Sequence, residues 1–558
     1  MTFTTLTFLV FLAIIFSLYW SVRSGAAQNK TLLLASYGFY SWWDWRFCFL
    51  MLASSLVDYE LAKRIDQSSK QNHRRWLLRL SIVSNLGLLA SFKYFNFFVE
   101  NLIQVANQIG WSPDLTTLSI ILPLGISFYT FQTLGYTIDV YRKQLAPAKN
   151  VVDYLAFVSF FPQLVAGPIE RASHMLPQFA IKRAFDHHAA TDGVRQMLWG
   201  FFKKMVIADR LALAVNPVFD NPTGYSGPHL MMGTVFFAFQ IYCDFSAYSD
   251  IAIGSAKLFN IRLSQNFAYP YFSQSIGEFW RRWHISLSYW FRDYVYIPLG
   301  GNRKGRVRYR VNLLLTFLLS GLWHGAAWNF VAWGGVNGLA VGLPIGGSRK
   351  QQRLSLQTSN DEASNDLIRG GSERSVLCRS AFDANTALNG MAIVNCDSVV
   401  SAADAVTHES AIQGSNPVHD STSLNIATPG GDRLLPRPGT LLRIYGTFAV
   451  LCVAWVLFRA ATLTDALLIY QRIVEDILRV DAYRELSQLL DADRYQRKTA
   501  TFLLAFVCWE WLFRRQPHSL RIGRFPTVIR WTLYTILIWS TLYLMPKTGT
   551  GEFVYFEF

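Results

Sequence analysis

The chain is poor in charged residues and lacks the signatures of common soluble enzymes. Only 16% of its 558 residues are charged, whereas 51% are hydrophobic and 15% aromatic; a soluble domain usually carries about 25% charged residues. The six cysteines form no CxxC pair and no metal-ligand spacing, so we expect no metal site. HExxH, GxSxG, GxxxxGK[ST] and the Rossmann glycine fingerprint are also missing. These absences disfavour zinc peptidases, α/β-hydrolases and nucleotide-binding folds.

Long apolar runs are what the chain has instead. They are long enough to cross a bilayer, which takes about 20 residues as a helix. We predict an all-α polytopic membrane protein with roughly ten to twelve membrane-embedded helices, including re-entrant or interfacial segments around a central tunnel. The net charge of +15 comes from short basic clusters between apolar runs. Such clusters favour headgroup anchoring, so we expect a membrane and no nucleic acid as partner.

The composition also divides the chain. From residue 346 to 438 it becomes rich in Ser, Asn, Asp and Gly and poor in aromatics, and such a segment cannot bury enough apolar surface to offset its ordering entropy. We therefore predict a membrane core at 1–345, a polar and disordered loop at 346–438, and C-terminal transmembrane helices of the same core at 439–558.

Two apolar segments are too interrupted for simple membrane spans. Residues 157–171 contain a proline and a Gly-Pro pair. Helix breakers at membrane depth are tolerated only where protein or a cavity covers the backbone, so we expect a bent element that lines a cavity. Residues 270–301 are aromatic and basic, and a helix would place Trp280, Trp283 and His284 on one face. Such a helix would lie in the membrane interface or under a cavity mouth.

One histidine, His324, lies in a run from 311 to 348 that has no Asp, Glu, Lys or Arg. It either makes a structural hydrogen bond across a helix interface or faces a cavity as a functional group. Gly321 and Gly325, with two alanines, leave room around the imidazole. Flat walls are available from three tryptophans (Trp323, Trp328 and Trp333). We favour the functional interpretation.

Acidic residues in apolar context are the other candidates. Asp139 is one, and Tyr242, Asp244 and Asp250 lie in a second, polar stretch of an apolar run. These groups form either a hydrogen-bonded knot between helices or the lining of a channel. We favour the knot.

Five motifs in order carry a resemblance to a known family: "LPLGISFYTFQTLGYTIDVYR", "FPQLVAGPIER", "YCDFSAYSDIAIG", "FWRRWHISLSYWFRDYVYIPLGG" and "SGLWHGAAWNFVAWG". The chain resembles the membrane-bound O-acyltransferase (MBOAT) family, and within it the bacterial alginate O-acetyltransferase branch. The resemblance covers nearly the whole chain outside 346–438. That segment departs from the branch, in which we expect a shorter connection.

The resemblance implies roles for the two histidines of these motifs. His324 matches the essential histidine of the W-H-G motif, and His284 matches the second histidine, in W-R-R-W-H. A neutral histidine suits proton removal from a hydroxyl because its unperturbed pKa of about 6.5 lies near neutral pH. The remaining predicted site residues line the substrate tunnel (Trp323, Asn329, Trp280, Asp244 and Tyr242) or dock the donor or a partner (Arg281 and Arg282).

The function implied by the resemblance is transfer of an acetyl group from a cytoplasmic thioester, acetyl-CoA, across a bacterial inner membrane. The acceptor is an exopolysaccharide such as alginate, reached directly or through a periplasmic acetyltransferase partner. No permanently bound cofactor is expected. The alternatives are D-alanyl transfer from a carrier protein to teichoic acid and, in a different class, a transporter with a proton or solute path through His324 and Asp244.

Overall fold

The computed structural model describes residues 1–113, 117–118, 121–165, 167–342, 434–492 and 494–544. The polar loop predicted at 346–438 therefore lies outside the described residues, apart from its last few positions. Every regular element in the described ranges is a helix or a helical turn. Residues on the two sides of the gap, within 1–343 and 427–558, fold into one unit.

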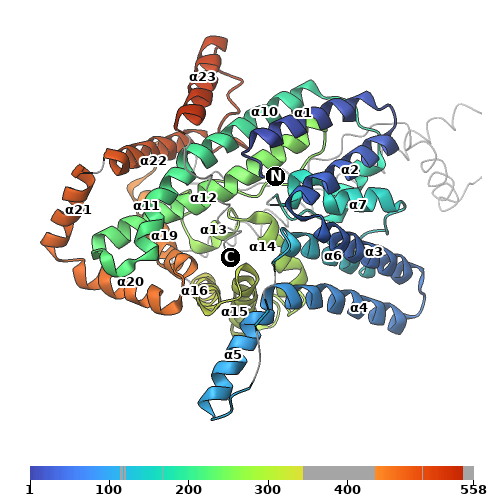
Figure 1. The fold of residues 1–558 in the computed structure, drawn as a ribbon, viewed down its shortest axis with the longest axis horizontal. Coiled ribbons are helices and arrows are strands. Elements are labelled where there is room, and N and C mark those ends of the chain that lie inside the picture. The colour runs from blue at the N-terminus through green and yellow to red at the C-terminus, as the bar shows by residue number, and fades with distance from the viewer. Residues whose placement is uncertain (114–116, 119–120, 166, 343–433, 493, 545–558) are drawn as a thin grey trace, which may run out of the picture. The chain divides into compact units, whose positions relative to one another are not determined.

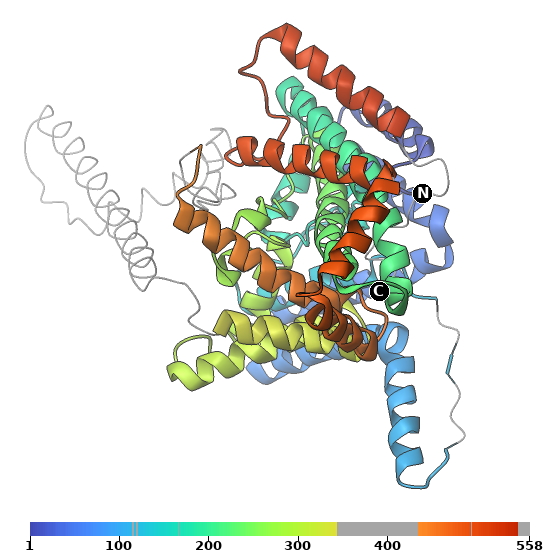
Figure 2. The same cartoon turned by 90° about the vertical axis from the view of Figure 1, so that its left-hand side faces the viewer.

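The N-terminal part of this unit is a set of antiparallel helices. They are α1 (Leu6–Ser21), α2 (Gly25–Asp44), α3 (Arg46–Gln67), α4 (Gln71–Leu89), α5 (Phe95–Gln108), α6 (Ile126–Tyr141), α7 (Val151–Ser159), α8 (Phe161–Leu164) and α9 (Ala172–Ala180). A π-helical turn, Ala90–Tyr94, joins α4 to α5. Helices α3, α4 and α6 pack together, whereas α5 projects away from its neighbours (Figures 1 and 2).

The middle of the unit is built around one long helix, α12 (Gly227–Leu258), most of which is buried. It is preceded by α10 (His187–Phe202), the π-helical turn Lys203–Ala208 and α11 (Asp209–Asp220). Helices α10 and α12 lie side by side (Figure 1). A Cβ on Gly193 would stand 2.5 Å from the Gly254 carbonyl oxygen. The two backbones therefore pack at a distance that only glycine permits at this point.

The remaining helices include the segments that carry His284 and His324. They are α13 (Ile276–Trp280), α14 (Ile285–Phe291), α15 (Gly305–His324), α16 (Trp328–Gly342), α19 (Pro438–Arg459), α20 (Leu463–Asp476), α21 (Val480–Ala492), α22 (Arg494–Phe513) and α23 (Thr527–Leu544). A π-helical turn, Arg292–Tyr296, follows α14, and 3-10 turns lie at Pro222–Gly224 and Pro270–Phe272. Helix α19, which follows the gap, packs on both α12 and α16.

Three helical runs in the described ranges are long and apolar enough to cross a membrane: Gln71–Gln108, Gly227–Leu258 and Pro438–Arg459. Helix α1 is a shorter apolar helix. Large apolar side chains also stand on the outside, such as Leu6 and Leu442, where lipid would cover them. The predicted fold class, an all-α polytopic membrane protein, is confirmed.

The two interrupted segments fold differently from each other. Residues 157–171 bend as predicted: α7 ends at Ser159, and Phe160 leaves the helix before the short α8. The continuous helix considered for 270–301 is wrong. Helix α13 stops at Trp280, and His284 has a left-handed backbone (φ 43°) that no α-helix contains. The part from Arg282 to Leu287 is buried in the unit instead of lying along one helix at an interface.

Candidate active site

His324 is the last residue of α15, and its side chain is buried. The helix ends here because Gly325 turns into an extended conformation (φ −156°, ψ 148°). The Gly325 N–H still donates to the Gly321 carbonyl at 3.3 Å. A short connection then leads into α16, so His324 stands at the closed end of a helical hairpin.

Glycines set how closely the two helices of this hairpin approach. A Cβ on Gly321 would collide with the Phe330 carbonyl, and one on Gly334 would collide with the Phe317 carbonyl. A Cβ on Gly325 would collide with the Phe330 ring. The space beside Gly321 is therefore filled by α16. The prediction that Gly321 opens room around the imidazole is wrong, because the glycine serves helix packing there.

Aromatic rings surround the His324 imidazole. Ring centroids of Trp323 and Trp333 lie 5.0 Å away, and that of Phe458, from α19, lies 5.4 Å away. Trp328, the third tryptophan predicted as a wall, is instead 58% exposed and donates to Asn101 Oδ1 at 2.8 Å. Two of the three predicted tryptophans therefore flank the histidine, and the third wall comes from a helix distant in sequence.

Trp323 also contacts the second histidine. The His284 ring centroid lies 6.0 Å from that of Trp323 and 4.6 Å from that of Phe245. His284 is 1% exposed, and neither of its ring nitrogens has a hydrogen-bond partner among the described residues. The fold thus places two histidines that are forty positions apart against one indole.

The chain directly after His284 is held by one buried residue, Asn266. The Ile285 N–H donates to the Asn266 carbonyl at 3.0 Å. The Ser286 hydroxyl donates to the Asn266 Oδ1 at 2.9 Å. These bonds hold the left-handed turn that presents the imidazole of His284 to Trp323. Sequence analysis missed Asn266, because no local pattern links it to a histidine eighteen positions later.

Lys93 is a second residue that the sequence analysis missed. It lies in the π-helical turn between α4 and α5, and its ammonium donates to the carbonyls of Trp323 (2.7 Å) and His324 (2.9 Å). The hydroxyl of Tyr94 donates to the Leu322 carbonyl at 3.0 Å. Carbonyls at a helix C-terminus lack intrahelical partners and attract cations. This turn therefore fixes the end of α15 that carries His324. The only signal in the sequence is a lone lysine in an apolar run.

A cavity of about 530 Å³ lies next to His324, with Gly325, Ala326 and Ala327 in its wall. This volume is within the range of about 300–1,000 Å³ typical of ligand pockets. Asn329, predicted to line the tunnel, is in the wall and donates from Nδ2 to the Ala460 carbonyl at 2.8 Å. Lys93, Asn96 and Arg459 supply the other polar groups. The predicted central tunnel stays a prediction.

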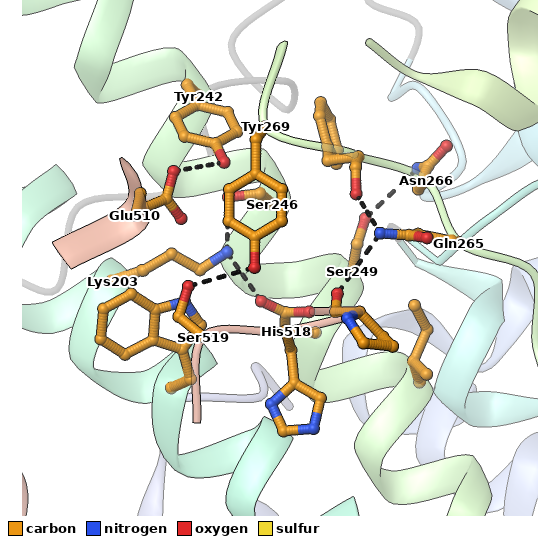
Figure 3. A pocket seen from close by; sticks show the side chains of 15 residues that line it. Lys203, Tyr242, Ser246, Ser249, Gln265, Asn266, Tyr269, Glu510, His518 and Ser519 are labelled. Atoms are coloured by element: carbon orange, nitrogen blue, oxygen red, sulfur yellow. Dashed lines mark hydrogen bonds and ion pairs between the residues drawn. The ribbon is translucent and has the colours of Figure 1, made fainter. Parts of the chain in front are cut away.

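Tyr242 lies elsewhere, at a small polar cavity of about 30 Å³ (Figure 3). Its hydroxyl donates to Glu510 at 2.7 Å. Nearby, the Lys203 ammonium lies 2.6 Å from the Ser246 hydroxyl and 2.7 Å from Asp250. The cavity is large enough for one water molecule, and these polar side chains would form hydrogen bonds with it. The arrangement joins the π-helical turn Lys203–Ala208, α12 and α22.

Asp244 belongs to a buried ion-pair cluster. The Lys204 ammonium lies 2.8 Å from Asp244 and 2.8 Å from Asp209, and all three side chains are at most 6% exposed. Asp139 similarly accepts a hydrogen bond from the Tyr294 hydroxyl at 2.8 Å. These contacts tie helices to one another, which is the pattern of a hydrogen-bonded knot. In the described part of the chain no group of three histidine, cysteine or acidic side chains could hold a metal ion.

The basic segment before His284 separates into a buried part and an exposed part. Trp280 donates to Asn337 at 3.3 Å, and its ring packs on Trp333. Arg282 is 2% exposed and is paired with Glu278 at 2.9 Å. The docking prediction is therefore wrong for Arg282, because a carboxylate four residues earlier holds its guanidinium inside the protein. Arg281 is exposed, and its role in docking the donor or a partner stays a prediction.

Comparison with known proteins gives consistent matches. Residues 41–360 match the family described as "MBOAT, membrane-bound O-acyltransferase family". A Pseudomonas putida protein named "Probable alginate O-acetylase AlgI" is 41% identical over 361 residues, which cover 63% of this chain and 73% of that protein. A protein of the same name from Azotobacter vinelandii is 43% identical over 344 residues, covering 61% and 67%. A Helicobacter pylori "Peptidoglycan O-acetyltransferase" is 40% identical over 339 residues, covering 56% and 63%.

Proposed function

The chain belongs to the membrane-bound O-acyltransferase family and is an O-acyltransferase, and from this premise we propose that it moves an acetyl group across the membrane for O-acetylation of an exopolysaccharide. The donor in this proposal is a cytoplasmic thioester, acetyl-CoA, and the acceptor is alginate or a similar polysaccharide. The membrane is the bacterial inner membrane, and a periplasmic acetyltransferase partner or the polysaccharide itself receives the acetyl group. The names of the O-acetylating relatives support this proposal.

One observation carries the proposal: His324 is buried among aromatic rings at a helix end, and the residues that follow it, Gly325 to Ala327, line a cavity of ligand size. In this proposal an imidazole nitrogen takes the proton of an acceptor hydroxyl while the hydroxyl oxygen attacks the thioester carbonyl carbon. The new C–O bond forms, the C–S bond breaks, and the departing thiolate receives the proton from the imidazolium. General base catalysis of this kind contributes typically about 10²–10⁴-fold.

His284 has a supporting role in the same proposal. It contacts Trp323 together with His324, and its two ring nitrogens have no partner among the described residues. Either nitrogen can therefore bind donor or acceptor, or donate a hydrogen bond to the oxygen on which negative charge develops. The Trp323 ring packs against both imidazoles.

The test uses purified protein in nanodiscs with radiolabelled acetyl-CoA. His324→Ala should lower thioester hydrolysis or transfer by about 100-fold or more, with thermal unfolding close to wild type. His229→Ala is the matched control, since His229 is also buried but lies at the start of α12, bonded to Ser226. Full activity of folded His324→Ala would refute the catalytic assignment.

The same assay separates the alternatives. Turnover from a D-alanyl carrier protein but not from acetyl-CoA would favour D-alanyl transfer to teichoic acid. Peptidoglycan is a second candidate acceptor, because the Helicobacter pylori relative with that name is 40% identical. The transporter alternative is not retained, since the chain belongs to a family of acyltransferases.

A further inference from the structure

The cavity beside His324 has two cations in its wall, Lys93 and Arg459, and no carboxylate among its lining residues. We infer that this cavity binds an oxyanion of a substrate, either the carboxylate of an acidic sugar or a phosphate of a nucleotide thioester. The inference rests on the proposed function, because it assigns the ligand chemistry of the same site.

Lys93 is the stronger argument. A lysine ammonium has three N–H donors, and two of them go to the carbonyls of Trp323 and His324. No carboxylate lies within ion-pair distance of Lys93 in the part of the chain that the structure describes, while its ammonium stands at the cavity wall. A partly buried ammonium without a counterion in an apolar helical run is unfavourable. An anionic ligand in the cavity would supply that counterion and take the third donor.

Arg459 reaches the cavity from a different element, the end of α19. Its Nη2 donates to Asn216 at 3.1 Å, and the guanidinium lies 3.5 Å from Asp220. The Asp220 side chain is 67% exposed, so solvent weakens this pair. A guanidinium carries five donors, so most of them are available to a ligand. The π-helical turn and α19 thus bring one cation each to a single cavity.

An oxyanion bound here would also orient the substrate. The cavity wall includes Gly325, the residue after the proposed base, and the Lys93 ammonium bonds to the His324 carbonyl, so the anion site and the base are close in the fold. Anchoring the anion would hold one hydroxyl, or the thioester carbonyl, near His324 and leave the others out of reach. The cavity would then select both the class of substrate and the atom that reacts.

The experiment measures binding in the His324→Ala background, so that turnover does not interfere, and in nanodiscs, so that both membrane faces are accessible. The probes are an oligomannuronate, its carboxyl-reduced neutral form, and CoA. The variants are Lys93→Met and Arg459→Gln, and the control is Lys63→Met, an exposed lysine on α3. Loss of one charge-assisted hydrogen bond should raise the Kd of the anionic ligand about 10- to 100-fold.

The probes identify the source of the anion. If the effect is on the oligomannuronate and absent with its neutral form, the cavity takes the acceptor carboxylate; if it is on CoA, the cavity takes a donor phosphate. Equal binding of both anionic probes to the parent His324→Ala protein and to its Lys93→Met and Arg459→Gln variants would overturn the inference. If Lys93→Met fails to fold, Arg459→Gln tests the inference in its place. Lys93→Arg keeps the positive charge and should bind the anionic probe as tightly as the parent protein does.

The two proposals fail separately. If the wild type transfers acetyl groups but binding of the anionic probes does not depend on Lys93 or Arg459, the anion site is refuted and the proposed function remains intact. Binding that depends on Lys93, with no acyl transfer by the wild type from any thioester, would refute the proposed function and leave the anion site.

Discussion

Substitution of Gly321 by alanine tests whether the close contact of α15 and α16 positions His324. The added methyl would collide with the Phe330 carbonyl and would stand 3.3 Å from the Gly334 Cα. Both are backbone atoms, so no side chain can rotate away and the helices must separate. Overpacking of this kind costs typically 1–3 kcal/mol, and alanine recovers up to about 1 kcal/mol of helix propensity. We expect a net loss of about 2 kcal/mol.

Gly335→Ala on the same hairpin is the matched control. Its new Cβ would lie 3.6 Å from the Leu318 Cδ2, an ordinary van der Waals contact. The substitution should therefore be neutral or stabilise the protein by up to about 1 kcal/mol through helix propensity alone. The two variants differ only in what the same added methyl meets.

The assay combines unfolding in detergent with acyl transfer at a temperature where both variants are folded. Gly321 lies three residues before His324, so a displaced helix end moves the imidazole, and misplacement by about 1 Å can cost about 100-fold in rate. Gly321→Ala should lose rate beyond its loss of folded protein, and Gly335→Ala should not. If the two variants have equal stability and equal rate, the argument that the glycine contact positions the histidine is refuted.

Three further predictions follow from other parts of the fold. His284→Gly should be about 1 kcal/mol more stable than His284→Ala in thermal unfolding, because glycine adopts φ 43° without strain; equal melting temperatures would contradict this. Lys204→Met should destabilise the protein by about 3–5 kcal/mol, since it strands two buried carboxylates. Asp244→Asn should cost less and spare the rate per folded molecule, and a rate loss without destabilisation would instead make Asp244 a lining residue. A hydrogen bond to Glu170 raises the pKa of His174, so this pair stabilises the fold fully below about pH 6.5 and loses that effect as pH rises through the raised pKa. Melting curves between pH 6 and 8 should therefore slope more steeply for wild type than for His174→Asn, and parallel curves would contradict the assignment.

Sequence reasoning located His324 because it departs from its surroundings, whereas His284 was located through the resemblance of its W-R-R-W-H motif. An imidazole in a run without charges needs a cause, and that argument does not depend on tertiary structure. The contact of both histidines with Trp323 could not be predicted, because nothing in local spacing brings residue 284 to residue 324. The helix predicted through His284 failed for a related reason. The left-handed backbone there is held by Asn266, which lies in another segment.

Two charged residues, Arg282 and Lys93, show which contacts can be inferred from neighbouring residues in the sequence and which cannot. Burial of Arg282 had a local signal, since Glu278 lies four residues earlier on the same turn. The role of Lys93 had none, because its partners are backbone carbonyls more than two hundred positions away. Side chains that bond to backbone leave no complementary residue in the sequence to search for.

The wall of the His324 site has a consequence for how the protein is made. Phe458 and Arg459 come from α19, which follows the long segment after α16. The ribosome therefore synthesises every helix up to α16 before it synthesises the ring and the cation that complete the site. During that interval the histidine is in place without its full enclosure. The wall of the site is thus completed late in biosynthesis, when α19 packs onto the hairpin of α15 and α16.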